Sequence, residues 1–223
     1  MRQLPTPKGQ PYIAANPIPA KKITERKATS ESTPQRALKQ PAANKTCDLV
    51  IMIDDMGFRK KAYAEIKALA LDLTLSFLPH APYTAAHAKA ANRDGIESRI
   101  HLPMQAKRLT PEAHTLTTDS TFEEINERLW SAKQKLPHAV GVNNHQGSAF
   151  TESQVAVNRF VKAVAPMQLM LLDSRTTADS RLAKTAKANS IPTKERHVDL
   201  EHNEGQPYAE AMITKALAQC RRK

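Results

Sequence analysis

The feature of this sequence that most constrains its fold is a regular alternation of short apolar runs with longer amphipathic segments. The runs expected to form strands cover residues 49–55, 73–79, 98–103, 139–145, 168–174 and, with the weakest pattern, 195–201. The segments expected to form helices cover 59–70, 84–94, 121–136, 151–165, 178–189 and 206–219. Strands that are each followed by a helix predict an α/β fold with a parallel sheet. The few polar residues in the runs predict strands that are buried on both faces.

Two of the expected helices carry a start signal. Thr121 and Glu124 have the spacing of a capping box, in which each side chain accepts a hydrogen bond from the other residue's backbone N–H. Thr151 stands at the start of the next amphipathic segment and is expected to open that helix.

The composition changes sharply near residue 46. Seven of the fifteen prolines fall before that point, among Lys, Ser, Thr, Gln and Ala, and no helical or strand periodicity appears there. We expect residues 1–46 to form a disordered linker and residues 47–223 to form one domain.

The net charge of +11 raises the question of nucleic-acid binding. Residues 1–46 hold nine of the 33 basic residues and only two of the 22 acidic ones, so most of the excess charge lies in the expected linker. Aromatic residues make up 4% of the chain, which leaves few platforms for stacking bases. These features argue against specific nucleic-acid recognition. Loose binding of a polyanion by the basic linker remains an alternative, and it predicts that deleting residues 1–46 abolishes partner binding.

No segment has the length and apolarity of a membrane span, and residues 1–46 contain no apolar stretch of the kind a secretory signal needs. A cytoplasmic protein and a chain that lacks an upstream leader both remain open.

Cys47 and Cys220 are too few for a disulfide framework. They lie at the start of the first strand and the end of the last helix, so we hypothesise that they pair if the protein is exported.

Polar residues follow the expected strands at the points where those strands end. They are Asp54, Asp55, His80, His101, Asn143, Asn144, His145, Asp173, Ser174 and Arg175. Since the carboxyl ends of parallel strands meet at one edge, these side chains are expected to converge there. This convergence predicts an active site.

Four short motifs within these strand ends resemble those of the divergent polysaccharide deacetylase family. The motifs are Asp54-Asp55-Met56-Gly57, His101-Leu102-Pro103-Met104, Gly141-Val142-Asn143-Asn144-His145-Gln146-Gly147-Ser148 and Leu172-Asp173-Ser174-Arg175-Thr176. The resemblance runs from about Leu49 to the end of the chain and implies an irregular (β/α) barrel. Members of the family usually continue into a further strand that ends in Gly-His-Pro, so we expect this barrel to lack its last strand.

The resemblance also implies roles for the acidic residues and histidines. In the wider group of polysaccharide deacetylases, the first Asp of the pair is the general base and the second binds a divalent metal with two histidines. Asp54 is then the base, and Asp55 and His101 are ligands. The position of the second histidine holds Gln105, a poor ligand, and His145 at another strand end is expected to replace it. One carboxylate and two imidazoles suit a divalent ion, with zinc as the expected one.

Less specific interpretations of the same residues remain open. One Asp of the pair can cap a helix while the other is solvated, and His101 can be a hydrogen-bonded structural histidine. Asn143 and Asn144 either support the ligands, contact substrate or only fix a turn. Asp173 and Arg175 are expected to line the rim, as substrate contacts or as an ion pair that positions the loop. His80, His87, His114 and His138 are interpreted as surface or packing residues.

The resemblance implies a metal-dependent hydrolase that removes N- or O-acetyl groups from a polysaccharide or from peptidoglycan, at the periplasm or cell envelope. The alternative is a catalytically weak or inactive relative that binds glycans, with a protein partner in the envelope. Gln105 and the expected lack of the last strand favour the alternative, whereas Asp54, Asp55 and His145 favour the enzyme.

Overall fold

The structure is a computed structural model that describes residues 48–112, 114–201 and 205–220. These residues belong to one compact unit, Lys45–Lys223. The expected linker over residues 1–46 lies outside the described residues, and so does Cys47, which the disulfide hypothesis requires.

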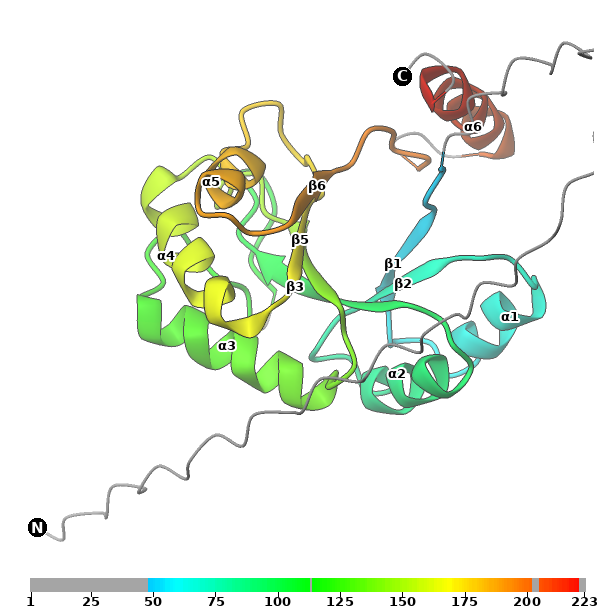
Figure 1. Cartoon of the computed structure of the whole chain (residues 1–223), viewed down its shortest axis with the longest axis horizontal. Coiled ribbons are helices and arrows are strands. Elements are labelled where there is room, and N and C mark those ends of the chain that lie inside the picture. Colours follow the sequence, from blue (N-terminus) through cyan, green and yellow to red (C-terminus); the bar gives the residue numbers. More distant parts are fainter. Residues whose placement is uncertain (1–47, 113, 202–204, 221–223) are drawn as a thin grey trace, which may run out of the picture. The chain divides into compact units, whose positions relative to one another are not determined.

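Strands and helices alternate along the described chain, as the sequence predicts (Figure 1). The strands are β1 (Met52–Met56), β2 (Thr74–Phe77), β3 (Ser98–Met104), β4 (Gly141–Gln146), β5 (Met170–Asp173) and β6 (Thr193–Glu195). The helices are α1 (Ala62–Ala68), α2 (Thr84–Arg93), α3 (Phe122–Lys135), α4 (Gln154–Val164), α5 (Leu182–Ala188) and α6 (Gln206–Cys220), with a 3-10 turn η1 (Ala165–Met167) after α4.

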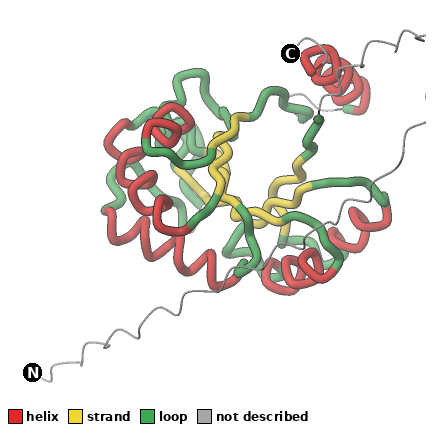
Figure 2. The backbone as a smooth tube through the Cα atoms, viewed as in Figure 1, coloured by secondary structure: helices red, strands yellow, loops and turns green. Residues whose placement is uncertain are grey.

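All six strands pair in parallel and in chain order, from β1 to β6. Figure 2 shows the sheet curled into an incomplete ring, with helices α1 to α5 on its outer side. This arrangement is an α/β barrel-like fold, and the predicted fold class is confirmed. Within the described residues, β1 and β6 are the two edge strands.

The hydrophobic core lies between the outer face of the sheet and the helices. Its fully buried strand residues include Leu75, Phe77, Ile100, Val142 and Leu171. Its helix residues include Ile125, Leu129, Val157, Phe160 and Leu182. These helix positions recur at intervals of three or four residues, the spacing at which side chains share one face of a helix.

The inner face of the sheet is polar, which the sequence did not predict. Ser76, His101 and Asn143 come from β2, β3 and β4, and Asn143 contacts both of the other two there. Arg99 lies two residues before His101 and is also buried. A side chain at Gly141 would collide with the Arg99 guanidinium and the carbonyl of Met170, so only glycine fits. The predicted burial on both faces is confirmed for β2 and β3, in which every residue is buried, whereas β1 and β6 are partly exposed. The buried inner positions of β2, β3 and β4 are polar and not apolar.

Two of the predicted element boundaries also differ. The capping box of Thr121 and Glu124 is confirmed at the start of α3. Helix α4, however, begins at Gln154 with Ser153 as its cap, because the Thr151 hydroxyl donates to the carbonyl of Gly147 instead. The sixth strand ends at Glu195, where the sequence placed its beginning.

Helix α6 has no buried residue, and it ends beside the start of the domain, with Cys220 Sγ 3.7 Å from the carbonyl oxygen of Asp48. None of the described helices combines the length and apolarity that spanning a membrane requires.

The loop after β5 is held by Asp173, whose carboxylate is fully buried. It accepts hydrogen bonds from the backbone N–H of Arg175 and Ala183 and from the Ser180 hydroxyl. These three bonds join the end of β5 to the start of α5. The buried Asp173 carboxylate therefore fixes the loop between β5 and α5, which forms part of the rim.

We expect the Asp173→Ala variant to lower the free energy of unfolding by about 2–4 kcal/mol, because three donors lose a buried charged acceptor. Urea unfolding followed by circular dichroism measures this loss. Asp179→Ala is the matched control, since Asp179 lies exposed in the same loop and should change stability by less than about 0.5 kcal/mol. Equal unfolding midpoints for the two variants would contradict this role.

Candidate metal centre

The carboxyl ends of β1, β3 and β4 bring Asp55, His101 and His145 together. One ligand atom from each residue lies within 4.8 Å of the other two. Asp55 Oδ1 is 3.2 Å from His101 Nε2 and 2.9 Å from His145 Nδ1, and the two imidazole nitrogens are 3.2 Å apart. We call these three residues the triad.

A break in the register of β1 directs both neighbouring carboxylates at His101. The pairing of β1 with β2 shifts between Ile53 and Met56, and Asp55 adopts a left-handed backbone with φ of 57°. Asp54 Oδ1 lies 3.8 Å from Nδ1 of His101, while Asp55 Oδ1 lies at its Nε2. In a regular strand these two side chains would point to opposite faces. The following turn needs Gly57, because a side chain there would collide with Thr84.

Asn143 holds His101 from inside the sheet and is itself 1% exposed. Its carboxamide accepts from the Ser76 hydroxyl and donates to Asp54 Oδ1 and the Ser174 hydroxyl. Its Nδ2 also lies 2.9 Å from His101 Nδ1. Asn143 thus supports a candidate ligand and the neighbouring carboxylate together, and its burial keeps it from contacting substrate.

Glu112, in the loop after β3, holds the other nitrogen of His145. Its Oε1 is 3.2 Å from His145 Nε2 and also accepts from the side chain of Gln146. Burial favours a lower pKa for His145, but the hydrogen bond and charge of Asp55, followed by those of Glu112, outweigh it and raise this pKa. A carboxylate on the far nitrogen is the partner that orients a metal-binding histidine.

Asp55 is kept ionised by the same contacts. The hydrogen bond from His101, and next the one from His145, lowers the pKa of Asp55 well below its usual range, although burial opposes the shift. The triad therefore presents a negatively charged oxygen at the point where the two imidazoles converge.

Two further residues lie on this rim, of which Glu112 was not predicted and His80 was expected at a strand end without a role in the site. Glu112 lies in an irregular loop, away from any strand end. His80, which was interpreted as a surface or packing residue, has its Nε2 3.8 Å from Glu112 Oε2, and its ring packs against Phe58. Burial is the main cause of a lowered pKa of His80.

Gln105 is directed away from the triad. Its side-chain oxygen accepts from the backbone N–H and hydroxyl of Thr118. His145 and not Gln105 therefore stands with Asp55 and His101.

The remaining predicted site residues lie beside or beneath the triad. Asn144 is buried, accepts from the backbone N–H of Ser174 and donates to the carbonyl of Gln146, so it joins two loops. Asp173 lies beneath the rim, and a fully buried carboxylate does not contact substrate. Its expected side-chain ion pair is also absent, since the Arg175 guanidinium pairs with Glu195 and the carbonyl of Ala178.

The triad fits a divalent metal ion. Two imidazole nitrogens bound to zinc at about 2.1 Å in a tetrahedral arrangement lie roughly 3.4 Å apart, close to the separation of 3.2 Å between His101 Nε2 and His145 Nδ1. His101 and His145 each donate a ring proton to the same carboxylate oxygen, Oδ1 of Asp55. A cation at that point would replace those protons.

The curled parallel sheet and the triad on its carboxyl rim define an α/β barrel-like protein with a candidate metal centre. The sequence model of one family, the divergent polysaccharide deacetylases, matches residues 51–223, and the chain belongs to that family. This membership supports a deacetylase-like function that is related to carbohydrates.

Curated relatives and a solved structure resemble this chain. The uncharacterized protein YibQ of Escherichia coli K12 is 29% identical over 78% of this chain and 55% of its own length. An uncharacterized protein of Haemophilus influenzae is 33% identical over 69% of this chain and 55% of its own length. This chain thus spans about half the length of the curated relatives it matches. The crystal structure of the uncharacterized protein ATU2773 from Agrobacterium tumefaciens has the same fold, with a TM-score of 0.76 at 21% identity over 83% of this chain and 77% of that protein.

We expect protein freed of metal by a chelator to bind one zinc ion per chain in a calorimetric titration. His145→Ala and Asp55→Asn should abolish stoichiometric binding, because each removes one of three ligands. His138→Ala is the control, since His138 is exposed on the surface and away from the triad. Retention of one ion per chain by both triad variants would refute this centre.

We also expect zinc affinity to fall as the pH drops through neutrality. Because the pKa of His145 is raised, its Nδ1 carries a proton at a higher pH than an ordinary histidine, and that proton competes with the cation. The Glu112→Gln variant removes a charge that raises this pKa, so the pH at which affinity is half lost should shift downward. Glu127→Gln on the exposed surface is the control. An identical pH dependence in all three proteins would contradict the role of Glu112.

Proposed function

We propose that this domain is a metal-dependent hydrolase that removes N- or O-acetyl groups from a polysaccharide or from peptidoglycan. The observation that carries the proposal is the convergence of Asp55, His101 and His145 beside a second carboxylate, Asp54. Family membership supports the general class of function, whereas the reaction and its substrate are our proposal.

Zinc is the ion that we propose for the triad, because one carboxylate with two imidazoles is a set that zinc favours. When bound, the ion would polarise the acetyl carbonyl and lower the pKa of a water molecule. The chain's own part is to hold the ligands, with Asn143 beside His101 and Glu112 on the far nitrogen of His145.

Asp54 is the proposed general base. Its side chain is 40% exposed, and its Oδ1 accepts from Asn143, which leaves the other oxygen available to a water molecule. Asp54 would take a proton from the water that attacks the acetyl carbon. It would then return that proton to the leaving nitrogen or oxygen as the acyl bond breaks, giving acetate and a free amine or hydroxyl.

Phe58 gives the rim an exposed aromatic surface three residues after Asp55. It follows Gly57 at the end of β1 and is 50% exposed, and its ring meets that of His80 edge-on at 5.4 Å. We propose that a sugar ring packs on this surface, since an exposed aromatic ring offers a large apolar face at low cost in conformational entropy.

A glycan-binding relative without catalysis is the second candidate. The observation that favours it is the commitment of Gln105 to Thr118, which leaves His145 to complete the triad from a different strand. This candidate predicts metal and glycan binding with no release of acetate. The location at the cell envelope and the binding of polyanions by residues 1–46 remain predictions.

We expect zinc-loaded protein to release acetate from chitooligosaccharides or from peptidoglycan fragments, as measured with an enzyme-coupled acetate assay. Asp54→Asn should lower the rate by about 10²–10⁴-fold, the contribution typical of a general base. Its zinc content should stay unchanged, because Asp54 is outside the triad.

Asp119→Asn, an exposed substitution, is the matched control for activity. No acetate from wild-type protein that holds zinc and binds glycan would favour the second candidate. Full activity of Asp54→Asn would remove Asp54 from the mechanism.

A further inference from the structure

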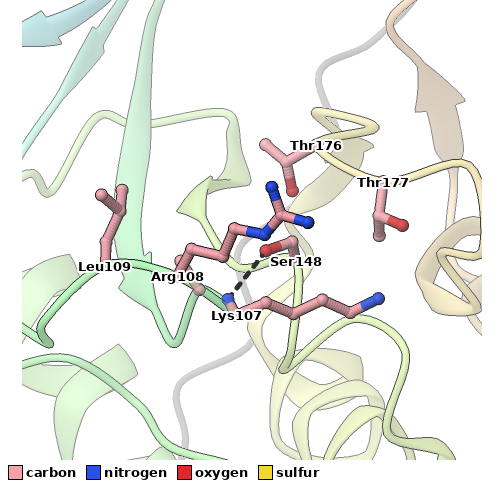
Figure 3. Close-up of a pocket in the computed structure, with 7 residues that line it drawn as sticks. Lys107, Arg108, Leu109, Ser148, Thr176 and Thr177 are labelled. Carbon is pink, nitrogen blue, oxygen red and sulfur yellow. Dashed lines mark hydrogen bonds between the residues drawn. The ribbon is translucent and has the colours of Figure 1, made fainter.

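A pocket of about 340 Å³ lies on the same rim as the triad, and the proposed mechanism does not use it (Figure 3). Its lining comes from the loops that follow β3, β4 and β5, and consists of Ala106, Lys107, Arg108, Leu109, Ser148, Thr176 and Thr177. Ser148 is three residues after His145, and Thr176 is two residues after Ser174. The loops that support the metal centre therefore also form this pocket.

Charge in the pocket is unevenly compensated. Lys107 Nζ lies 2.7 Å from Glu152, whose pKa is lowered chiefly by this hydrogen bond. The neighbouring Arg108 is exposed and has no hydrogen bond or ion pair to any described residue. The pocket thus keeps one uncompensated guanidinium, a group that binds carboxylates and phosphates through two parallel hydrogen bonds.

Hydroxyl groups around Arg108 differ in what they can offer a ligand. The Thr176 hydroxyl donates to the carbonyl of Gln146, and the Thr177 hydroxyl donates to Glu152. Ser148 Oγ instead accepts from the backbone N–H of Lys107, so its own proton is left for a ligand (Figure 3). Arg108 and Ser148 together form a donor pair for an oxyanion.

Thr176 links the pocket to the metal centre by a short chain of contacts. Its hydroxyl bonds Gln146, the Gln146 side chain bonds Glu112, and Glu112 bonds His145. The triad and the pocket are thus connected along one rim.

We propose that this pocket binds an anionic substituent, a carboxylate or a phosphate ester, on the glycan whose neighbouring sugar occupies the metal centre. The part that concerns the glycan rests on the proposed function, whereas the selection of an anion rests on Arg108 and Ser148. Leu109, 57% exposed at the pocket wall, supplies an apolar contact for the carbon atoms that carry the anion.

The test compares the binding of three disaccharides to the zinc-loaded full chain by calorimetry. They are neutral di-N-acetylchitobiose, N-acetylglucosaminyl-N-acetylmuramic acid with its lactyl carboxylate, and di-N-acetylchitobiose 6-phosphate. Wild-type protein should bind at least one anionic sugar roughly threefold to tenfold more tightly than the neutral one, and added salt should reduce the difference. The two anionic sugars distinguish a carboxylate from a phosphate.

Arg108→Gln should remove the preference, and Arg108→Lys should retain part of it, because an ammonium keeps the charge but not the paired geometry. Arg93→Gln is the matched control, an exposed arginine at the end of α2 that should leave the preference unchanged. Equal binding of all three sugars, no binding of either anionic sugar, or a preference that survives in Arg108→Gln would each overturn the proposal.

Acetate release is measured on the same samples, so that failure of the proposed hydrolase can be distinguished from failure of the proposed anion-binding pocket. A preference for the anion without acetate release supports the pocket and removes the hydrolase. Acetate release with equal binding of the three sugars supports the hydrolase and removes the pocket.

Discussion

The buried carboxamide of Asn143 is the interaction on which the arrangement of the rim most depends. From β4 it reaches Ser76 on β2, His101 on β3 and Asp54 on β1, as well as Ser174 in the loop after β5. A polar group this deeply buried is costly unless its hydrogen bonds are made. The strands that carry these partners must therefore keep one register and one curvature, and the interior of the curled sheet becomes a scaffold for the candidate metal centre.

Three strand ends on this rim contain a residue with a left-handed backbone. These residues are Asp55 near the end of β1, Gln146 at the end of β4 and Arg175 after β5, with φ of 57°, 55° and 50°. Such conformations cost on the order of 1–3 kcal/mol each for residues other than glycine, and they persist where the surrounding contacts require them. At Asp55 the left-handed backbone places the carboxylate within hydrogen-bonding distance of His101 and His145. At Arg175 the backbone N–H is bound by Asp173, which stabilises the turn from the core.

The sequence predicted most of the fold because each βα unit contains a short apolar run, which predicts the strand, and an amphipathic segment, which predicts the helix. It also predicted which strand ends carry chemistry, and the structure brings Asp55, His101 and His145 within reach of one ion. The burial of each rim residue was not predictable from the sequence. Asp173 and Arg175 belong to the same short motif, yet Asp173 is buried and Arg175 pairs with Glu195 nearer the surface. Glu112 was missed for a different reason, because a loop residue that meets its partner across 33 positions leaves no periodic signal.

Opposite charges are separated along the rim, and this separation has a physical basis. Asp54, Asp55 and Glu112 gather at the metal centre, where a cation would offset their mutual repulsion. A strongly basic pocket on the same rim would offer those carboxylates competing partners and disturb the ligand geometry. Glu152 pairs with Lys107, so that among the described residues that line the pocket the unpaired charge is that of Arg108. In the proposed function, a metal ion at the triad and an anionic group of the glycan at Arg108 would occupy different places on the rim, and the two opposite charges would set the direction of the bound glycan.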